Sequence, residues 1–224
     1  WNEPPKNNFL KKIKQIAIKN NLILIFDECT SGFRETFGGL HKKYKVYPDI
    51  AIFGKSLGNG YAINAILGTR KVMSCAEQTF LSSTFWSERS GPSAALKTLE
   101  IMEKTKSWKL ITKKGNYIRK NWKRIAKKYN IKLKISGLPS LSTFNFVSKN
   151  NNAYKTLISQ EMLKYGFLAS NSLYLSTFHS KKIMDSYLFY LEKVFKMIKD
   201  CEKTGNIKDY LKGPVCKTHF KRLN

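Results

Sequence analysis

The stretch that decides the fold is LILIFD, residues 22–27, together with the similar stretch DIAIFGK, residues 49–55. Each contains an uninterrupted apolar run, which is typical of a strand buried on both faces of a parallel sheet. Each closes on a charged residue, Asp27 in the first and Lys55 in the second. Ligands of open α/β sheets bind beyond the carboxyl ends of the strands. We therefore expect Asp27 and Lys55 to lie at a binding site.

The sequence around these strands predicts the rest of the architecture. Residues 9–20 have the apolar spacing of an amphipathic helix, and residues 62–68 (AINAILG) form a third strand candidate. A helix followed by buried strands predicts an α/β fold with a parallel, doubly wound sheet. Further on, we expect helical sequence at residues 91–129 with a bend near Trp108, strands at 131–135 and 142–147, and helices at 153–165 and 183–203. The change in pattern predicts two domains, residues 1–105 and 106–224.

The amino-acid composition limits the classes of binding partner that we expect. The 224 residues include 41 lysines and arginines against 15 acids, a formal net charge of +26. This charge indicates either an anionic partner, such as nucleic acid or a membrane surface, or a compositional bias. Because the lysines are dispersed and no nucleic-acid-binding motif accompanies them, we favour the bias and expect no specific nucleic acid. We also expect no membrane partner and no metal, and we expect free cysteines in a reducing cytoplasm.

Three segments occur in the order of a known family. Residues 27–34 (DECTSGFR) resemble the Asp-Glu-Val and Gly-Phe-Arg signature of class III aminotransferases, and Lys55 follows at a spacing similar to the family's. Residues 81–92 (LSSTFWSERSGP) resemble the segment that carries a phosphate-contacting threonine. Within the family, the chain looks similar to the glutamate-1-semialdehyde 2,1-aminomutases. The resemblance implies the C-terminal part of a fold-type I transferase that uses pyridoxal 5'-phosphate: part of the large parallel-sheet domain plus the small α+β domain.

The resemblance also implies roles for the matching residues. Lys55 would bind the cofactor through a Schiff base and then move a proton at the substrate's α-carbon, while Asp27 would keep the pyridine nitrogen protonated. Thr84, with Ser83 beside it, would hydrogen-bond the cofactor phosphate of the other subunit, which implies a homodimer. Cys29 would lie beneath the cofactor ring, where the family often has a valine of similar size.

Other polar residues keep more than one interpretation. Arg34 suits bidentate binding of a substrate carboxylate, and it equally suits a structural ion pair. Glu28 is expected to support the site by hydrogen bonding. The three histidines, His41, His179 and His219, are expected to be structural or exposed.

The sequence begins at Trp1, and the long N-terminal part of the family does not occur in it. The simplest expectation is a fragment of a cytoplasmic enzyme that acts on an amino-acid or amino-aldehyde substrate, by transamination or by intramolecular amino transfer. The alternative is a truncated, catalytically inactive protein of the same fold whose basic surface binds nucleic acid in a salt-sensitive manner.

Overall fold

The computed structural model describes residues 3–82 and 84–217. The chain divides into two compact units, residues 3–110 and the part from Ile111 onwards, and the division falls within helix α5 (Ser107–Lys128). The sequence predicts the boundary slightly earlier, between residues 105 and 106. None of the helices in these ranges combines the length and apolarity that crossing a membrane requires.

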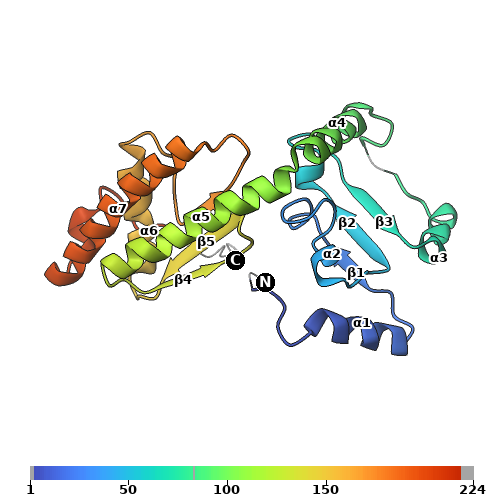
Figure 1. Ribbon diagram of the computed structural model, residues 1–224, viewed down its shortest axis with the longest axis horizontal. Coiled ribbons are helices and arrows are strands. Elements are labelled where there is room, and N and C mark those ends of the chain that lie inside the picture. Colours follow the sequence, from blue (N-terminus) through green and yellow to red (C-terminus); the bar gives the residue numbers. More distant parts are fainter. Residues whose placement is uncertain (1–2, 83, 218–224) are drawn as a thin grey trace, which may run out of the picture. The chain divides into compact units, whose positions relative to one another are not determined.

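The first unit is built on a three-stranded sheet of order β1–β2–β3 (Figure 1). β1 and β2 are parallel, and β3 is antiparallel to β2. The strands are β1 (Ile25–Asp27), β2 (Ile50–Phe53) and β3 (Ala65–Gly68). The helices are α1 (Phe9–Lys19), α2 (His41–Tyr44), α3 (Arg70–Met73) and α4 (Ser90–Thr105), with short 3-10 turns η1 (Lys55–Leu57) and η2 (Ser74–Gln78).

A small apolar core joins this sheet to α4. Ala51 and Phe53 point to the same side of β2, because side chains alternate along a strand, and both are buried. Ala95 of α4 packs in the same cluster, together with Phe33 and Leu57. Helix α4 also contacts η1, so it supports the turn that directly follows β2.

Two details of this sheet differ from the sequence-based expectation. β1 and β2 are parallel as predicted, but β3 is antiparallel because the connection of residues 54–64 holds no crossover helix. Burial on both faces of residues 22–26 is wrong for this chain, since Ile23 and Ile25 are 57% and 52% exposed. Leu24 and Phe26 alternate with them and are half-buried, so the described elements cover one face of β1.

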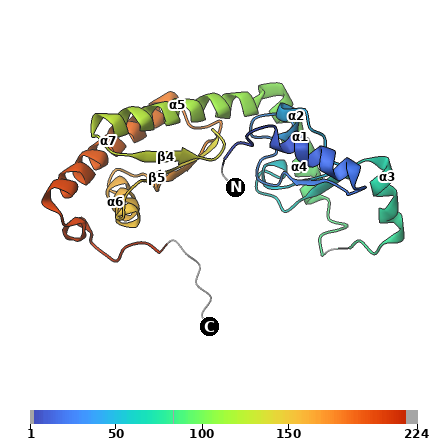
Figure 2. The ribbon, with the colours of Figure 1, turned by 90° about the horizontal axis from the view of Figure 1, so that it is seen from below.

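The second unit holds an antiparallel sheet of order β4–β5–β6 and three long helices. The part of α5 after Ile111 runs alongside β4 and β5 in both ribbon views (Figures 1 and 2). The predicted helices and the first two strands are confirmed, whereas β6 is not predicted. The elements are β4 (Leu133–Ser136), β5 (Leu141–Phe146), β6 (Ser172–Tyr174), α6 (Asn151–Leu163), α7 (Lys181–Thr204) and η3 (Ile207–Tyr210).

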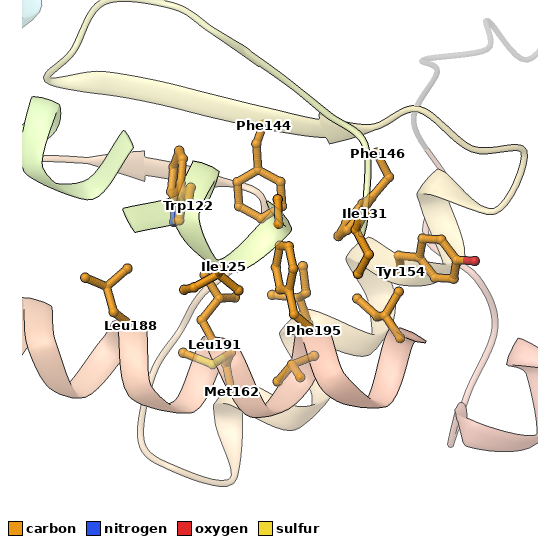
Figure 3. Close-up of a cluster of buried hydrophobic side chains, with 14 of the residues drawn as sticks. Trp122, Ile125, Ile131, Phe144, Phe146, Tyr154, Met162, Leu188, Leu191 and Phe195 are labelled. Atoms are coloured by element: carbon orange, nitrogen blue, oxygen red, sulfur yellow. The ribbon is translucent and has the colours of Figure 1, made fainter. Parts of the chain in front are cut away.

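Aromatic side chains form the centre of the second core (Figure 3). Trp122 of α5, Phe144 of β5 and Phe195 of α7 are fully buried. The ring centroids of Trp122 and Phe144 are 4.7 Å apart in an edge-on contact, a favourable geometry for aromatic pairs. The Trp122 Nε1–H donates to the Tyr187 hydroxyl at 3.2 Å, so the indole is buried without an unpaired donor.

Gly115→Ala is expected to destabilise the second unit by about 1–3 kcal/mol, although alanine normally stabilises a helix interior by about 1 kcal/mol over glycine. A Cβ at position 115 would lie 2.0 Å from the carbonyl oxygen of Pro139, a backbone atom in the β4–β5 turn. Unfolding free energies from urea denaturation measure the change. Asn116→Ala, at the exposed neighbouring position, is the control and should be neutral or stabilising; a stabilised Gly115→Ala protein would contradict the close packing.

The loop of residues 175–180, before α7, is expected to make stability depend on pH. The Ser176 N–H donates to His179 Nδ1 at 2.9 Å, an acceptor that protonation removes. Burial, and then the nearby charge of Lys114, lower the pKa of His179 below its ordinary value. The unfolded chain therefore binds more protons at His179 than the folded chain does. The stability that neutral His179 contributes is present above about pH 6.5, and it is lost as the pH falls through the lowered folded-state pKa.

The check is the unfolding free energy between pH 7.5 and pH 5 for the wild type and for His179→Gln. Because glutamine does not titrate, the wild type should lose stability more steeply than the variant on acidification. Equal slopes would show that His179 is not linked to folding.

Candidate functional site

Asp27 and Lys55 lie at the ends of two neighbouring parallel strands. Asp27 is the last residue of β1 and pairs in register with Ile52 of β2, while Lys55 begins η1 just beyond the end of β2. Parallel strands end at the same edge of a sheet, so both charged residues come to one edge. Both are exposed there. This edge is the candidate site.

The charges of Asp27 and Lys55 both act on the thiol of Cys29. The Cys29 backbone N–H donates to Asp27 Oδ1 at 3.0 Å. Burial raises the pKa of the Cys29 thiol, a side-chain hydrogen bond with Asp27 and the charge of Asp27 raise it further, and the charge of Lys55 opposes them. The thiolate form of Cys29 is therefore disfavoured at this edge.

Gly54 allows β2 to end against its neighbours. A Cβ at this position would lie 2.3 Å from Oδ1 of Asn64 and 3.3 Å from Sγ of Cys29. The first distance is too short for a real contact, so a larger residue would displace the Asn64 side chain. The absence of a side chain at residue 54 thus leaves room for the Asn64 side chain, directly before Lys55.

Lys55 combines a strained backbone with a defined side-chain contact. Its φ of +44° is in the left-handed region, which costs an L-residue about 1–2 kcal/mol. Its Nζ lies 2.5 Å from Oγ1 of Thr30, in the turn that follows β1. Strained residues persist where the surrounding structure fixes them, and they cluster at functional sites.

Glu28 and His41 interact with each other and stabilise the turn that follows β1. Glu28 is 4% exposed, and its Oε1 accepts from the His41 backbone N–H at 2.9 Å and lies 3.0 Å from His41 Nδ1. The Ser31 hydroxyl donates to the same carboxylate. This arrangement agrees with the supporting role expected for Glu28 and the structural role expected for His41.

The other predicted site residues lie elsewhere or outside the described chain. Thr84 is exposed in the turn of residues 84–87, before α4, and in the described ranges it makes no hydrogen bond to Asp27, Cys29 or Lys55. Ser83 lies outside the described residues. Arg34 is half-buried in the loop after β1. Residues 3–82 and 84–217 hold no group of three or more histidine, cysteine or acidic side chains that could bind a metal.

The sequence did not indicate the contact between Thr30 and Lys55, or the roles of Gly54 and Asn64. Thr30 stands inside the recognised motif, but its partner is 25 residues away, and nothing in the spacing predicts that contact. Gly54 precedes Lys55 in the sequence, and a glycine at the end of a strand is the one signal that could have indicated a close approach of a neighbouring group to the backbone.

Comparison with known proteins gives one family. The Aminotransferase class-III family matches residues 2–189. The 3-aminobutyryl-CoA aminotransferase of Cloacimonas acidaminovorans (strain Evry) is 32% identical over 176 residues, 78% of this chain and 42% of that protein. The glutamate-1-semialdehyde 2,1-aminomutase of Methanosphaera stadtmanae is 31% identical over 206 residues, 84% of this chain and 48% of that protein. The chain spans about half the length of these curated relatives.

Solved structures share the fold. The FumI protein of Sphingopyxis sp. MTA144, solved with pyridoxal phosphate, matches with a TM-score of 0.82 at 20% identity, over 91% of this chain and 50% of that one. Ornithine δ-aminotransferase of Plasmodium falciparum matches with a TM-score of 0.75 at 22% identity, over 88% of this chain and 53% of that one. The described chain therefore shares the fold of these solved proteins.

Replacing Lys55 should separate backbone strain from side-chain function. Lys55→Gly is expected to be more stable than Lys55→Ala by about 1 kcal/mol, because glycine adopts a φ of +44° without a steric penalty. Unfolding free energies of the two variants measure the difference. The same pair at Lys45, an exposed lysine with a φ of +53°, is the control for strain outside the site. A more stable Lys55→Ala protein would show that residue 55 is not strained.

Proposed function

The chain belongs to the class III aminotransferases, and from this membership we propose that the protein containing it transfers amino groups with pyridoxal 5'-phosphate. The observation that carries the proposal is the acid and the lysine at the ends of β1 and β2. When bound, pyridoxal phosphate acts as an electron sink for charge released at the substrate's α-carbon.

The described residues fit this cofactor. Asp27 is exposed at this edge, so its carboxylate can face a protonated ring nitrogen. The Lys55 amine is exposed and contacts the neutral hydroxyl of Thr30, so a carbonyl compound can reach it.

Each residue has a distinct task in this proposal. Lys55 holds the cofactor through Nζ and afterwards carries a proton to and from the substrate's α-carbon. The negative charge of Asp27 favours the protonated ring nitrogen. The protonated thiol of Cys29 packs beneath the ring. Thr84, together with Ser83, binds the cofactor phosphate in the other subunit, so the working protein is a homodimer.

Family membership favours this function over nucleic-acid binding by a decayed enzyme. Curated relatives of both kinds, an aminotransferase and an aminomutase, match the chain at similar identity, so the substrate is proposed only as an amino acid or an amino aldehyde. In the same proposal, residues 1–105 belong to the large domain and residues 106–224 form the small domain. The enzyme acts in the cytoplasm.

Treatment of the protein with pyridoxal phosphate and then borohydride should attach the cofactor irreversibly to Lys55, as a mass shift on the peptide that contains it. Lys55→Ala should abolish this shift, whereas Lys45→Ala should leave it unchanged. Asp27→Asn should still be modified but should lose amino transfer by about 100-fold or more, because the charge facing the ring nitrogen is removed. Modification spread over surface lysines, with no preference for Lys55, would contradict the proposed site.

Incubation with glutamate-1-semialdehyde alone distinguishes the two reactions. Turnover without an added amino donor is expected of an aminomutase, and strict dependence on a donor is expected of a transaminase. Failure of the protein to transfer amino groups in either assay, with cofactor present, would contradict amino transfer altogether.

A further inference from the structure

The hydroxyl of Thr30 is the hydrogen-bond partner of the Lys55 amine, at 2.5 Å between Oγ1 and Nζ. We propose that Thr30 is a positioning residue. Its uncharged hydroxyl holds the Lys55 amine by a hydrogen bond and so keeps the amine from forming an ion pair with Asp27. The proposal rests on the proposed function in one respect only, namely that Asp27 and Lys55 must both be available to the same cofactor.

Hydrogen bonds fix the turn that carries Thr30. The Gly32 N–H donates to the Glu28 carbonyl oxygen at 2.8 Å, which closes the turn around Thr30. A Cβ at Gly32 would lie 2.8 Å from the same oxygen, so the turn requires glycine. The buried Glu28 carboxylate is held in turn by Ser31 and His41. Thr30 therefore occupies a defined position at the edge of the sheet.

The position of Lys55 is defined independently. Its positive φ and its place at the start of η1 set the direction in which the side chain leaves the backbone. Two oxygen-bearing side chains come to the same edge of the sheet, Asp27 at the end of β1 and Thr30 in the turn that follows. The amine contacts Thr30, and in the described part of the chain no ion pair joins it to Asp27. Asp27 instead accepts the backbone N–H of Cys29.

The two possible partners have different chemical consequences. A hydroxyl accepts a hydrogen bond from an ammonium group and donates one to a neutral amine, so it binds lysine in both protonation states. A carboxylate favours the ammonium form. An ion pair between Asp27 and Lys55 would therefore keep the amine protonated and would occupy the acid. Contact with Thr30 avoids both effects.

The test treats the whole protein, without added cofactor, with a trace of acetic anhydride at pH 8. Mass spectrometry then measures the acetylation rate of Lys55 relative to that of Lys45. In Thr30→Val, which keeps the shape but removes the hydroxyl, the amine should turn to Asp27, and the rate should fall about tenfold, the effect of a one-unit rise in proton affinity. Thr30→Ser should retain the wild-type rate. Thr30→Val combined with Asp27→Asn should recover it, because no carboxylate remains to bind the ammonium group.

Equal rates in wild type and Thr30→Val would overturn the proposal, and so would a Thr30→Ser protein as slow as Thr30→Val. A fall that persists in the double variant would also overturn it, since the loss would then not depend on Asp27. The trapping of pyridoxal phosphate on Lys55 tests the proposed function separately. A wild type that shows the predicted labelling pattern but traps no cofactor would refute the function and leave the role of Thr30 supported.

Discussion

Two neighbouring parallel strands end at the same edge of a sheet, and the pairing of β1 with β2 is the constraint on which the candidate site depends. The register places Asp27 opposite Ile52, so Lys55 follows three residues (55 − 52) beyond the level of Asp27, at the same edge of the sheet. A slip of one residue would turn the side chains of β2 to the opposite face. The burial of Ala51 and Phe53 against α4 resists that slip, so the packing of an apolar core also sets the position of two charged groups.

Much of this arrangement could be predicted from the sequence because it depends on local patterns. The apolar runs that end at Asp27 and Lys55 predict two strands with charged ends, and the structure contains both strands. The periodic apolar residues that predict the long helices of the second unit are the residues that fill its core, among them Trp122 and Phe195. Patterns of this kind are strong wherever a long element buries one face.

The remaining features arise from contacts between distant residues or from the backbone, and no local pattern indicates them. The direction of β3 follows from its connection to β2, and the exposure of Ile23 and Ile25 depends on what packs above β1. The left-handed conformation of Lys55 is unexpected for a lysine, because glycine and asparagine are the residues that usually adopt it. Its contact with Thr30 joins two turns that are separate in the sequence. These features convert a pair of charged strand ends into a site with a defined geometry.

The protonation state of the cofactor's ring nitrogen most directly tests whether Asp27 and Lys55 serve a single site. It can be measured by ¹⁵N NMR on the protein loaded with pyridoxal phosphate labelled at that nitrogen. We predict a protonated nitrogen in the wild type at neutral pH, and a largely unprotonated one in Asp27→Ala, where the facing negative charge is gone. The same signal in both proteins would contradict the placement of Asp27 at the cofactor held by Lys55.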